Sequence, residues 1–151
     1  MKLNTKLTSV YLRLAISSAY LWEVADRIGI LGANGQPHVG WGDWTHFLDY
    51  AQKVMAFLPK GIIPTFAIVA SIGEAVFGGL VLIGLFTRVA AIGSGILSLL
   101  FAIAMAISFG IESPLGYSVF TLSAASFLLS TLPAYPWSLD ALRQKNKENS
   151  K

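Results

Sequence analysis

The chain has 151 residues, of which 54% are hydrophobic and only 13% are charged, with a formal net charge of +3 and no cysteine. A typical soluble domain carries about 25% charged residues, so this composition argues against a water-soluble protein. The lack of cysteine excludes disulfides, thiol redox chemistry and thiolate metal ligands within the chain. Most basic residues lie near the ends of expected helices, which membrane topology explains without a nucleic-acid partner.

Long uncharged runs predict an all-α integral membrane protein, a four-transmembrane-helix bundle formed by one domain over residues 1–142. The runs Val89–Ile111 and Ser113–Leu139 contain 23 and 27 residues, and about 20 apolar residues suffice to cross a hydrocarbon core of roughly 30 Å. Two further runs are long enough if each carries inward-facing charge. We expect the four spans at about residues 7–27, 64–86, 89–109 and 117–132.

The first span follows a basic segment and has some features of a signal peptide. Arg13 interrupts its apolar stretch, so we interpret the segment as a retained helix. Arg13, Ser17 and Tyr20 recur at helical spacing and share one face. Glu23 follows where the helix should leave the hydrocarbon. Arg13 has two interpretations here: a side chain that snorkels to the headgroups, or an inward-facing functional group.

Residues 28–42 are rich in glycine and include an Asn-Gly pair, which predicts a loop. Residues 43–58 then place hydrophobic side chains at helical spacing after a good N-cap, Asp43, and are too few to span. They predict an amphipathic interfacial helix in the first external loop, with aromatic side chains at the interface: Trp41, Trp44 and Phe47. His38 and His46 form no recognised ligand pattern, so we interpret them as solvent-facing and expect no metal site.

Small residues repeat at spacing four along the second span, in one series with Ser71, Ala75 and Gly79 and in another with Ala70, Glu74 and Gly78. In lipid, close backbone approach through small residues drives much of helix association. The third span repeats the pattern, so we expect packing through a set of small residues: Ser71, Ala75, Gly78, Gly79, Ser94, Ser98 and Ala102. Thr87 and Arg88 predict a tight connection that makes these spans an antiparallel hairpin.

The end of the chain is polar. A loop is expected at residues 110–116, and the hydroxyl residues of the last span can bond to their own helix carbonyls, so they do not indicate a pore. Residues 143–151 are charged and contain no apolar residue, which predicts a disordered cytoplasmic tail.

The distribution of basic residues predicts the topology. With both termini inside, eight of the eleven basic residues lie on the cytoplasmic side. This bias predicts a multi-pass protein of the bacterial cytoplasmic (inner) membrane, with N and C termini cytoplasmic.

Glu74 is the central candidate for a functional site, because thirteen uncharged residues lie on either side of it. Counted along its helix, it lies near the bilayer midplane, where a carboxylate cannot cheaply be both charged and unpaired. It either stays neutral and donates a hydrogen bond, or ionises and pairs with Arg13, which we favour. The expected intramembrane polar or ligand-binding site comprises Glu74, Arg13, Ser17, Tyr20 and Glu23.

Three blocks of sequence span nearly the whole chain: LRLAISSAYLW (Leu12–Trp22), IGEAVFGGLVLIGLFTRVAAI (Ile72–Ile92) and PWSLDAL (Pro136–Leu142). In these blocks the chain resembles the DoxX family of small four-span bacterial membrane proteins. The middle block is the most specific, with a Glu, glycines four and five residues later, and a Gly-Leu-Phe-Thr-Arg turn. Relatives of this type include the small subunit of thiosulfate:quinone oxidoreductases and a protein of methylamine utilisation, so the resemblance implies quinone-linked redox chemistry.

We therefore expect a non-catalytic subunit or accessory factor of a membrane redox system, which binds a quinone or another lipid-like molecule non-covalently within the bundle. Its expected partners are the lipid bilayer, redox subunits and further copies of the chain. Two alternatives stay open: a small oligomeric transporter or channel that uses Glu74, and a structural scaffold. The sequence has no nucleophile–base pair, phosphate loop or haem-attachment motif, so an enzyme acting alone is the least supported alternative.

Overall fold

The computed structural model describes residues 4–149. Over that range the chain is entirely helical and contains no strand, which confirms the all-α prediction. The elements are α1 (Thr5–Arg27), α2 (Trp44–Val54), the short 3₁₀ helix η1 (Lys60–Ile62), α3 (Ile63–Ile83), α4 (Thr87–Phe109), α5 (Glu112–Gly116), α6 (Val119–Thr131) and α7 (Leu139–Asn149).

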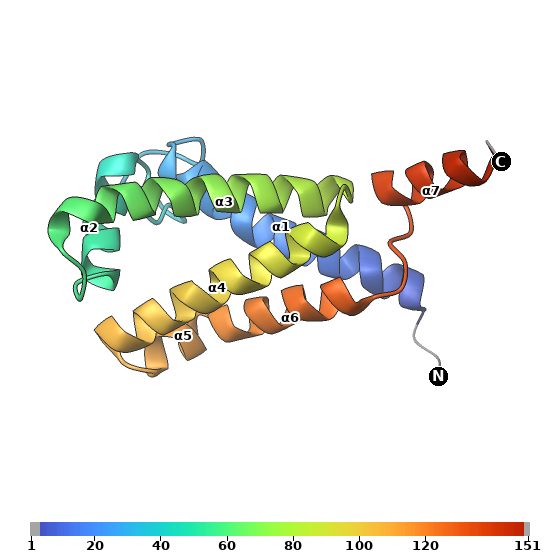
Figure 1. The fold of residues 1–151 in the computed structure, drawn as a ribbon. Helices are drawn as coiled ribbons and strands as arrows, with labels where there is room; N and C mark the ends of the chain where they lie inside the picture. The colour runs from blue at the N-terminus through green and yellow to red at the C-terminus, as the bar shows by residue number, and fades with distance from the viewer. Residues whose placement is uncertain (1–3, 150–151) are drawn as a thin grey trace.

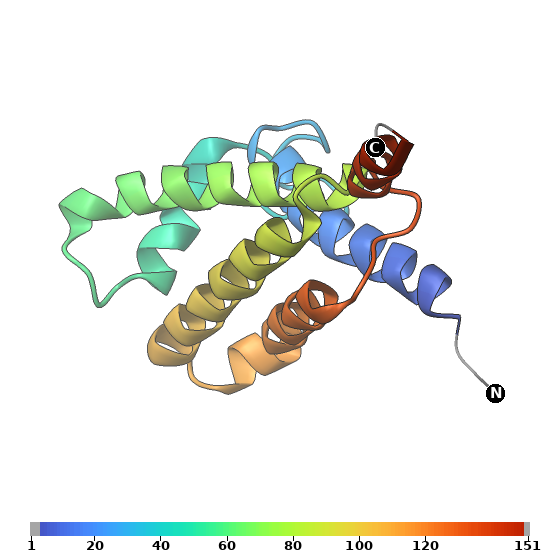
Figure 2. The same ribbon diagram turned by 45° about the vertical axis from the view of Figure 1, so that its right-hand side comes forward.

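The four longer helices α1, α3, α4 and α6 pack side by side. Helix α4 packs against α6, α1 packs against α3, and α3 packs against α4. Figures 1 and 2 show α3 and α4 joined at one end and diverging toward the other. Helix α2 lies at the divergent end, where it contacts both, and α7 projects from the opposite end (Figure 1). Helices α3 and α4 therefore converge at the α7 end and diverge toward α2.

Two of the described helices are long and apolar enough to cross a membrane, by length and composition: Lys60–Ile83, which joins η1 to α3, and Thr87–Phe109, which is α4. Within the most apolar 18-residue stretch of each helix, only 22% is buried in Lys60–Ile83 and 39% in Thr87–Phe109. Helix α6 is apolar but has only 13 residues. The criterion thus supports two of the four expected spans, and the four-span arrangement stays a prediction.

The connection between α3 and α4 differs from the expected one. The turn consists of Gly84–Phe86, whereas Thr87 and Arg88 form the first turn of α4. Gly84 ends α3 in the left-handed region, with φ of 68°, a conformation that glycine adopts at little cost. Thr87 belongs to the helix because a carboxylate from another helix, Asp140 of α7, accepts hydrogen bonds from its backbone N–H at 2.8 Å and its hydroxyl at 2.7 Å.

Two segments expected to lack helix contain one. Residues 112–116, within the expected loop at 110–116, form α5. Residues 143–149, expected to be disordered, belong to α7, so that prediction is wrong for the described part of the tail. The helical signal lies before the charged stretch: the Ser138 hydroxyl accepts a hydrogen bond from the Ala141 N–H at 3.0 Å, as an N-cap does. Residues 150–151 lie outside the described range.

The start of the expected interfacial helix agrees with the sequence, and its end does not. The Asp43 side chain caps α2 by accepting from the His46 N–H at 3.0 Å. The helix ends at Val54 rather than near residue 58, before Pro59 and η1. His46 is exposed in the first turn of α2, and its Nδ1 lies 2.8 Å from an Asp43 carboxylate oxygen; His38 is exposed in the preceding loop.

The expected packing residues do not all contact another helix. A Cβ on Gly78 would lie 3.1 Å from the Cβ of Tyr20, so the glycine allows α1 and α3 to approach closely. A Cβ on Gly79 would meet no atom within 4 Å. Ser94, Ser98 and Ala102 are fully buried on α4, while Ser71 and Ala75 are half-buried.

Adjacent glycines make a matched pair for testing this register. We expect Gly78→Val to destabilise the protein by about 1–3 kcal/mol, because the added atoms overlap Tyr20 and Leu21. Gly79→Val changes helix propensity equally but adds atoms in open space, so its unfolding midpoint in detergent should stay near that of the parent. Equal losses of stability in the two variants would contradict the α1–α3 register.

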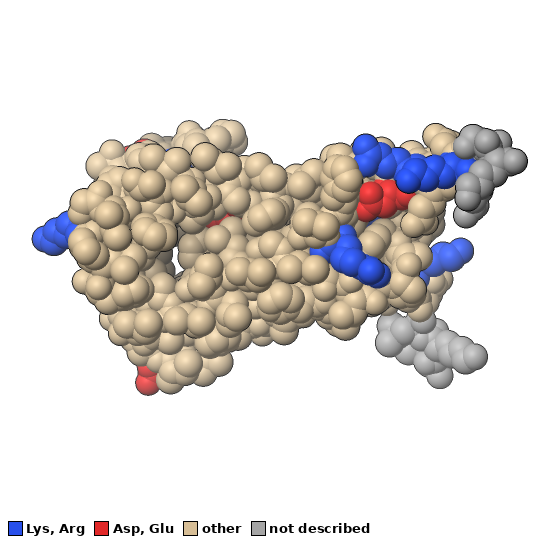
Figure 3. All heavy atoms as spheres, viewed as in Figure 1, with Lys and Arg blue, Asp and Glu red and all other residues tan. Residues whose placement is uncertain are grey.

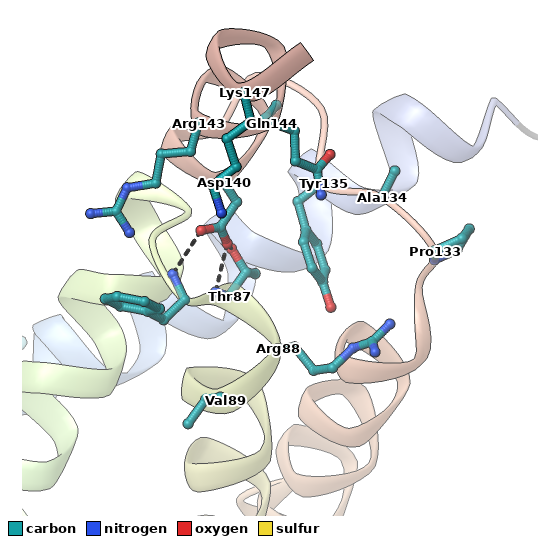
Figure 4. Close-up of a pocket in the computed structure, with 12 residues that line it drawn as sticks. Thr87, Arg88, Val89, Pro133, Ala134, Tyr135, Asp140, Arg143, Gln144 and Lys147 are labelled. Atoms are coloured by element: carbon teal, nitrogen blue, oxygen red, sulfur yellow. Dashed lines mark hydrogen bonds between the residues drawn. The ribbon is translucent and has the colours of Figure 1, made fainter. Parts of the chain in front are cut away.

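The carboxylate of Asp140 anchors α7 to the start of α4, as Figure 4 shows. Burial acts to raise the pKa of Asp140, but hydrogen bonds from Thr87 and Phe86, with the charge of Arg143, outweigh it and leave the pKa below the usual value. A lowered folded-state pKa means that this stabilisation is present above the unfolded-state pKa, about 4, and is lost as pH falls through the folded-state value.

We therefore expect α7 to stay docked at neutral pH and to separate from α4 below about pH 4. The chain has no native cysteine, so spin labels on cysteines introduced at the exposed Lys145 and Leu128 can report the distance between α7 and α6. The distance distribution should broaden in acid. Asp140→Ala should show the broad distribution already at pH 7, whereas Asp49→Ala, which removes an exposed carboxylate of α2, should not.

Candidate functional site

A buried ion pair joins α1 to α3 at the end of the bundle nearer α2. The guanidinium of Arg27 contacts both carboxylate oxygens of Glu74, with Nη2 3.1 Å from Oε1 and Nη1 on Oε2. Nη1 also donates to the Ser71 hydroxyl at 2.9 Å. The two charged side chains are 5% and 4% exposed. The Glu74 carboxylate is therefore paired in a two-point geometry, which is the strongest arrangement for this type of contact.

The expected pair between Arg13 and Glu74 is wrong. The Arg13 guanidinium lies at the other end of the bundle, where it donates to four backbone carbonyls. Its acceptors are Val81 at 3.0 Å, Leu82 at 2.7 Å, Pro136 at 3.1 Å and Trp137 at 3.2 Å. Arg13 thus satisfies the carbonyl end of α3 and ties it to the segment before α7.

The register of the antiparallel helices α1 and α3 decides which arginine meets Glu74. Gly78 lies against Tyr20, so moving back along α3 to Glu74 means moving forward along α1 toward Arg27. The two arginines are fourteen residues apart, about 21 Å along a helix. Arg13 therefore cannot reach Glu74. The expected pair of Glu74 with Arg13 presupposes helices that cross the same membrane slab in level register, whereas the contact at Gly78 sets their actual offset.

Aromatic rings and a tied loop cover Arg27. Its Cζ lies 4.0 Å from the ring centroid of Phe47 and 5.3 Å from that of Trp41, which are cation–π distances. Asp26 holds the loop in place, because its carboxylate accepts from three consecutive backbone N–H groups, those of Gly40, Trp41 and Gly42, at 2.9–3.1 Å. A Cβ on Gly40 would lie 2.7 Å from an Asp26 oxygen, so a larger residue there would displace the Asp26 carboxylate.

A hydroxyl cluster lies next to the ion pair. Tyr20 donates from its hydroxyl to the Ser94 carbonyl at 2.6 Å and contacts the Ser98 hydroxyl at 2.5 Å, which links α1 to α4. Among the described residues, four buried polar atoms lack a hydrogen-bond partner: Ser9 Oγ, Ser17 Oγ, Ser94 Oγ and Arg27 Nε. Arg27 Nε thus has no acceptor, although the two Nη atoms of the same guanidinium contact Glu74.

Two of the four residues expected beside Glu74 therefore lie close to it. Tyr20 and Glu23 are close enough to Glu74 to interact with it electrostatically, and Ser17 lies one turn earlier on the buried face of α1. Arg13 belongs elsewhere. The sequence analysis missed Arg27 as a site residue, although it follows Tyr20 by seven residues, a spacing that places both on one helix face.

The surface is hollowed between α3 and α4 near α2, as Figure 3 shows, and an acidic side chain is visible beside the hollow. Helix α2 bridges the divergent helices at this end. The Ser108 hydroxyl of α4 donates to the Val54 carbonyl at 2.6 Å, and the rings of Tyr50 and Phe109 are 6.1 Å apart. Burial raises the pKa of Tyr50, so its phenol is neutral at physiological pH.

No group of three or more His, Asp or Glu residues suited to a metal ion occurs among residues 4–149. Comparison with protein-family models, curated proteins and solved structures finds no match to this chain.

A double-mutant cycle tests the ion pair. Glu74→Leu or Arg27→Met alone leaves a buried charge without its partner, so each should cost about 3–5 kcal/mol of unfolding free energy. The double variant should cost far less than the sum, since both charges are gone. The matched cycle with Arg13→Met and Glu74→Leu should be additive. Additivity in the Arg27 cycle, measured by unfolding in detergent, would show that the pair contributes no coupling.

Proposed function

We propose that the chain is a DoxX-like multi-pass protein of a bacterial cytoplasmic membrane that binds a quinone or another lipid-like molecule between its helices. In this proposal it acts as a non-catalytic subunit or accessory factor of a redox system. One observation carries the proposal: a buried arginine–glutamate pair lies in an apolar helical bundle, and its Arg27 Nε lacks an acceptor. Figure 3 shows a hollow between α3 and α4 toward the same end of the bundle.

The membrane placement rests on the outer surfaces of the helices. The apolar windows of α3 and α4 are largely exposed, whereas the core helix of a soluble protein buries its apolar face. Figure 3 shows Lys and Arg gathered mainly near the α7 end, with a broad uncharged surface between the two ends. This pattern suits a bilayer that covers the middle of the bundle. In the proposal α1 and α6 complete the four spans, and both termini are cytoplasmic.

The ligand chemistry follows from the donors and walls of the site. Arg27 and Ser71 supply hydrogen-bond donors in an environment of low polarity, where such donors bind a carbonyl oxygen strongly. Phe47, Trp41 and Tyr50 supply aromatic surface next to these donors. A quinone combines carbonyl acceptors, a flat ring and an apolar tail. In the proposal, such a molecule enters from the lipid through the hollow between α3 and α4 that Figure 3 shows.

We expect a short-tail quinone to raise the unfolding temperature of the detergent-purified protein and to bind with one-to-one stoichiometry in native mass spectrometry. Ser71→Ala removes one polar group of the site and should weaken quinone binding several-fold. Ser18→Ala is the matched control, because the Ser18 hydroxyl is exposed and bonds only to the Ala15 carbonyl of its own helix at 3.0 Å.

The same preparation distinguishes the alternatives. Proton or cation flux in liposomes that is abolished by Glu74→Gln would favour a transporter or channel and contradict the accessory role. No bound molecule, no quinone-dependent stabilisation and no flux would favour a structural scaffold.

A further inference from the structure

A second site lies at the α7 end of the bundle, away from the ion pair. A pocket of about 450 Å³ opens between the start of α4, the segment 133–135 and α7, a volume within the usual range for small-molecule sites. Figure 4 shows Arg88 extending beneath Tyr135, while Arg143, Gln144 and Lys147 lie on α7 on the opposite side. Three elements that are separate in sequence thus form one pocket.

The lining of the pocket is basic. It contains three basic side chains, Arg88, Arg143 and Lys147, and one carboxylate, Asp140. Both oxygens of that carboxylate already accept hydrogen bonds from Phe86 and Thr87. The local charge therefore favours an anion.

The two arginines keep most of their donors available. Arg88 makes one long hydrogen bond within the described chain, 3.5 Å from Nη2 to the Leu132 carbonyl. Arg143 stacks with its Cζ 5.0 Å from the ring centroid of Phe86 and is exposed. A guanidinium carries five N–H donors in a planar fork that suits two oxygens of one phosphate. The pocket therefore offers phosphate-binding groups from two elements, α4 and α7.

An apolar surface leads away from the pocket along α4. Phe86 and Val89 line the pocket and are 57% and 68% exposed. One face of α4 continues this surface with exposed side chains at helical spacing: Ile92, Ile96 and Leu100. A free phosphate ion makes no use of this surface, whereas the acyl chains of a lipid do.

We infer that this pocket binds the phosphodiester headgroup of an anionic glycerophospholipid from the adjacent leaflet, with its acyl chains along α4. The inference rests on the membrane placement in the proposed function, but not on quinone binding, because the two sites lie at opposite ends of the bundle. A basic pocket at a cytoplasmic membrane surface is a recognised type of anionic lipid site.

The test uses the full chain in nanodiscs of mixed phosphatidylglycerol and phosphatidylcholine, released into the mass spectrometer with its retained lipids. Membrane insertion is scored first by resistance to alkaline extraction, so that failure to insert is separated from failure to select a lipid. The parent protein should retain phosphatidylglycerol in preference to phosphatidylcholine. The double variant Arg88→Gln/Arg143→Gln should lose this preference by about tenfold or more.

The matched control is Lys53→Gln/Lys60→Gln, which removes two exposed positive charges at the α2 end. It should retain the preference, and unfolding temperatures should show that both double variants fold. If the control variant loses the preference for phosphatidylglycerol to the same extent, the preference comes from overall surface charge, and the proposed lipid site is wrong. Inserted protein that retains both lipids equally would overturn it too. Displacement of phosphatidylglycerol by millimolar inorganic phosphate would assign the pocket to a free anion instead of a lipid.

Discussion

The contact between Arg27 and Glu74 is the constraint on which the α2 end of the bundle depends. Removing two charges from water costs several kcal/mol each, and only close, hydrogen-bonded geometry offsets that cost. The pair meets this condition through its two-point contact and the hydroxyl of Ser71. It reinforces the register of α1 against α3 that the contact of Gly78 with Tyr20 sets, because a shift by one turn would leave both charges buried and unpaired.

The rest of this end is arranged around the same arginine. Asp26, the residue before Arg27, holds three N–H groups of the following loop, and that loop and α2 bring Trp41 and Phe47 over the guanidinium. At the opposite end, charged side chains bond to the backbone instead of to each other. There, Arg13 and Asp140 satisfy backbone groups at the end of α3 and the start of α4. Charged side chains thus serve side-chain pairing near α2 and the capping of helix ends near α7.

The amino-acid sequence by itself determined the helical class, the approximate limits of the long helices, the N-cap at Asp43 and the prominence of Glu74. These features depend on periodicity, on uncharged length and on local capping, all of which are readable within a few turns of chain. It also grouped Tyr20 and Glu23 with Glu74 in one expected site. A charge isolated by thirteen uncharged residues on each side is costly within a bilayer unless it is paired.

Only the tertiary structure decided which arginine pairs with Glu74, because the offset between antiparallel helices follows from side-chain packing, here the contact of Gly78 with Tyr20. The sequence also cannot tell the two adjacent glycines apart. Gly78 faces α1, whereas Gly79 faces open space. The helix in the tail depended on Ser138 as an N-cap and on Asp140 bonding to α4, more than fifty residues earlier in the chain. Contacts between residues so distant in sequence are set by how whole helices pack, so no local pattern could specify them.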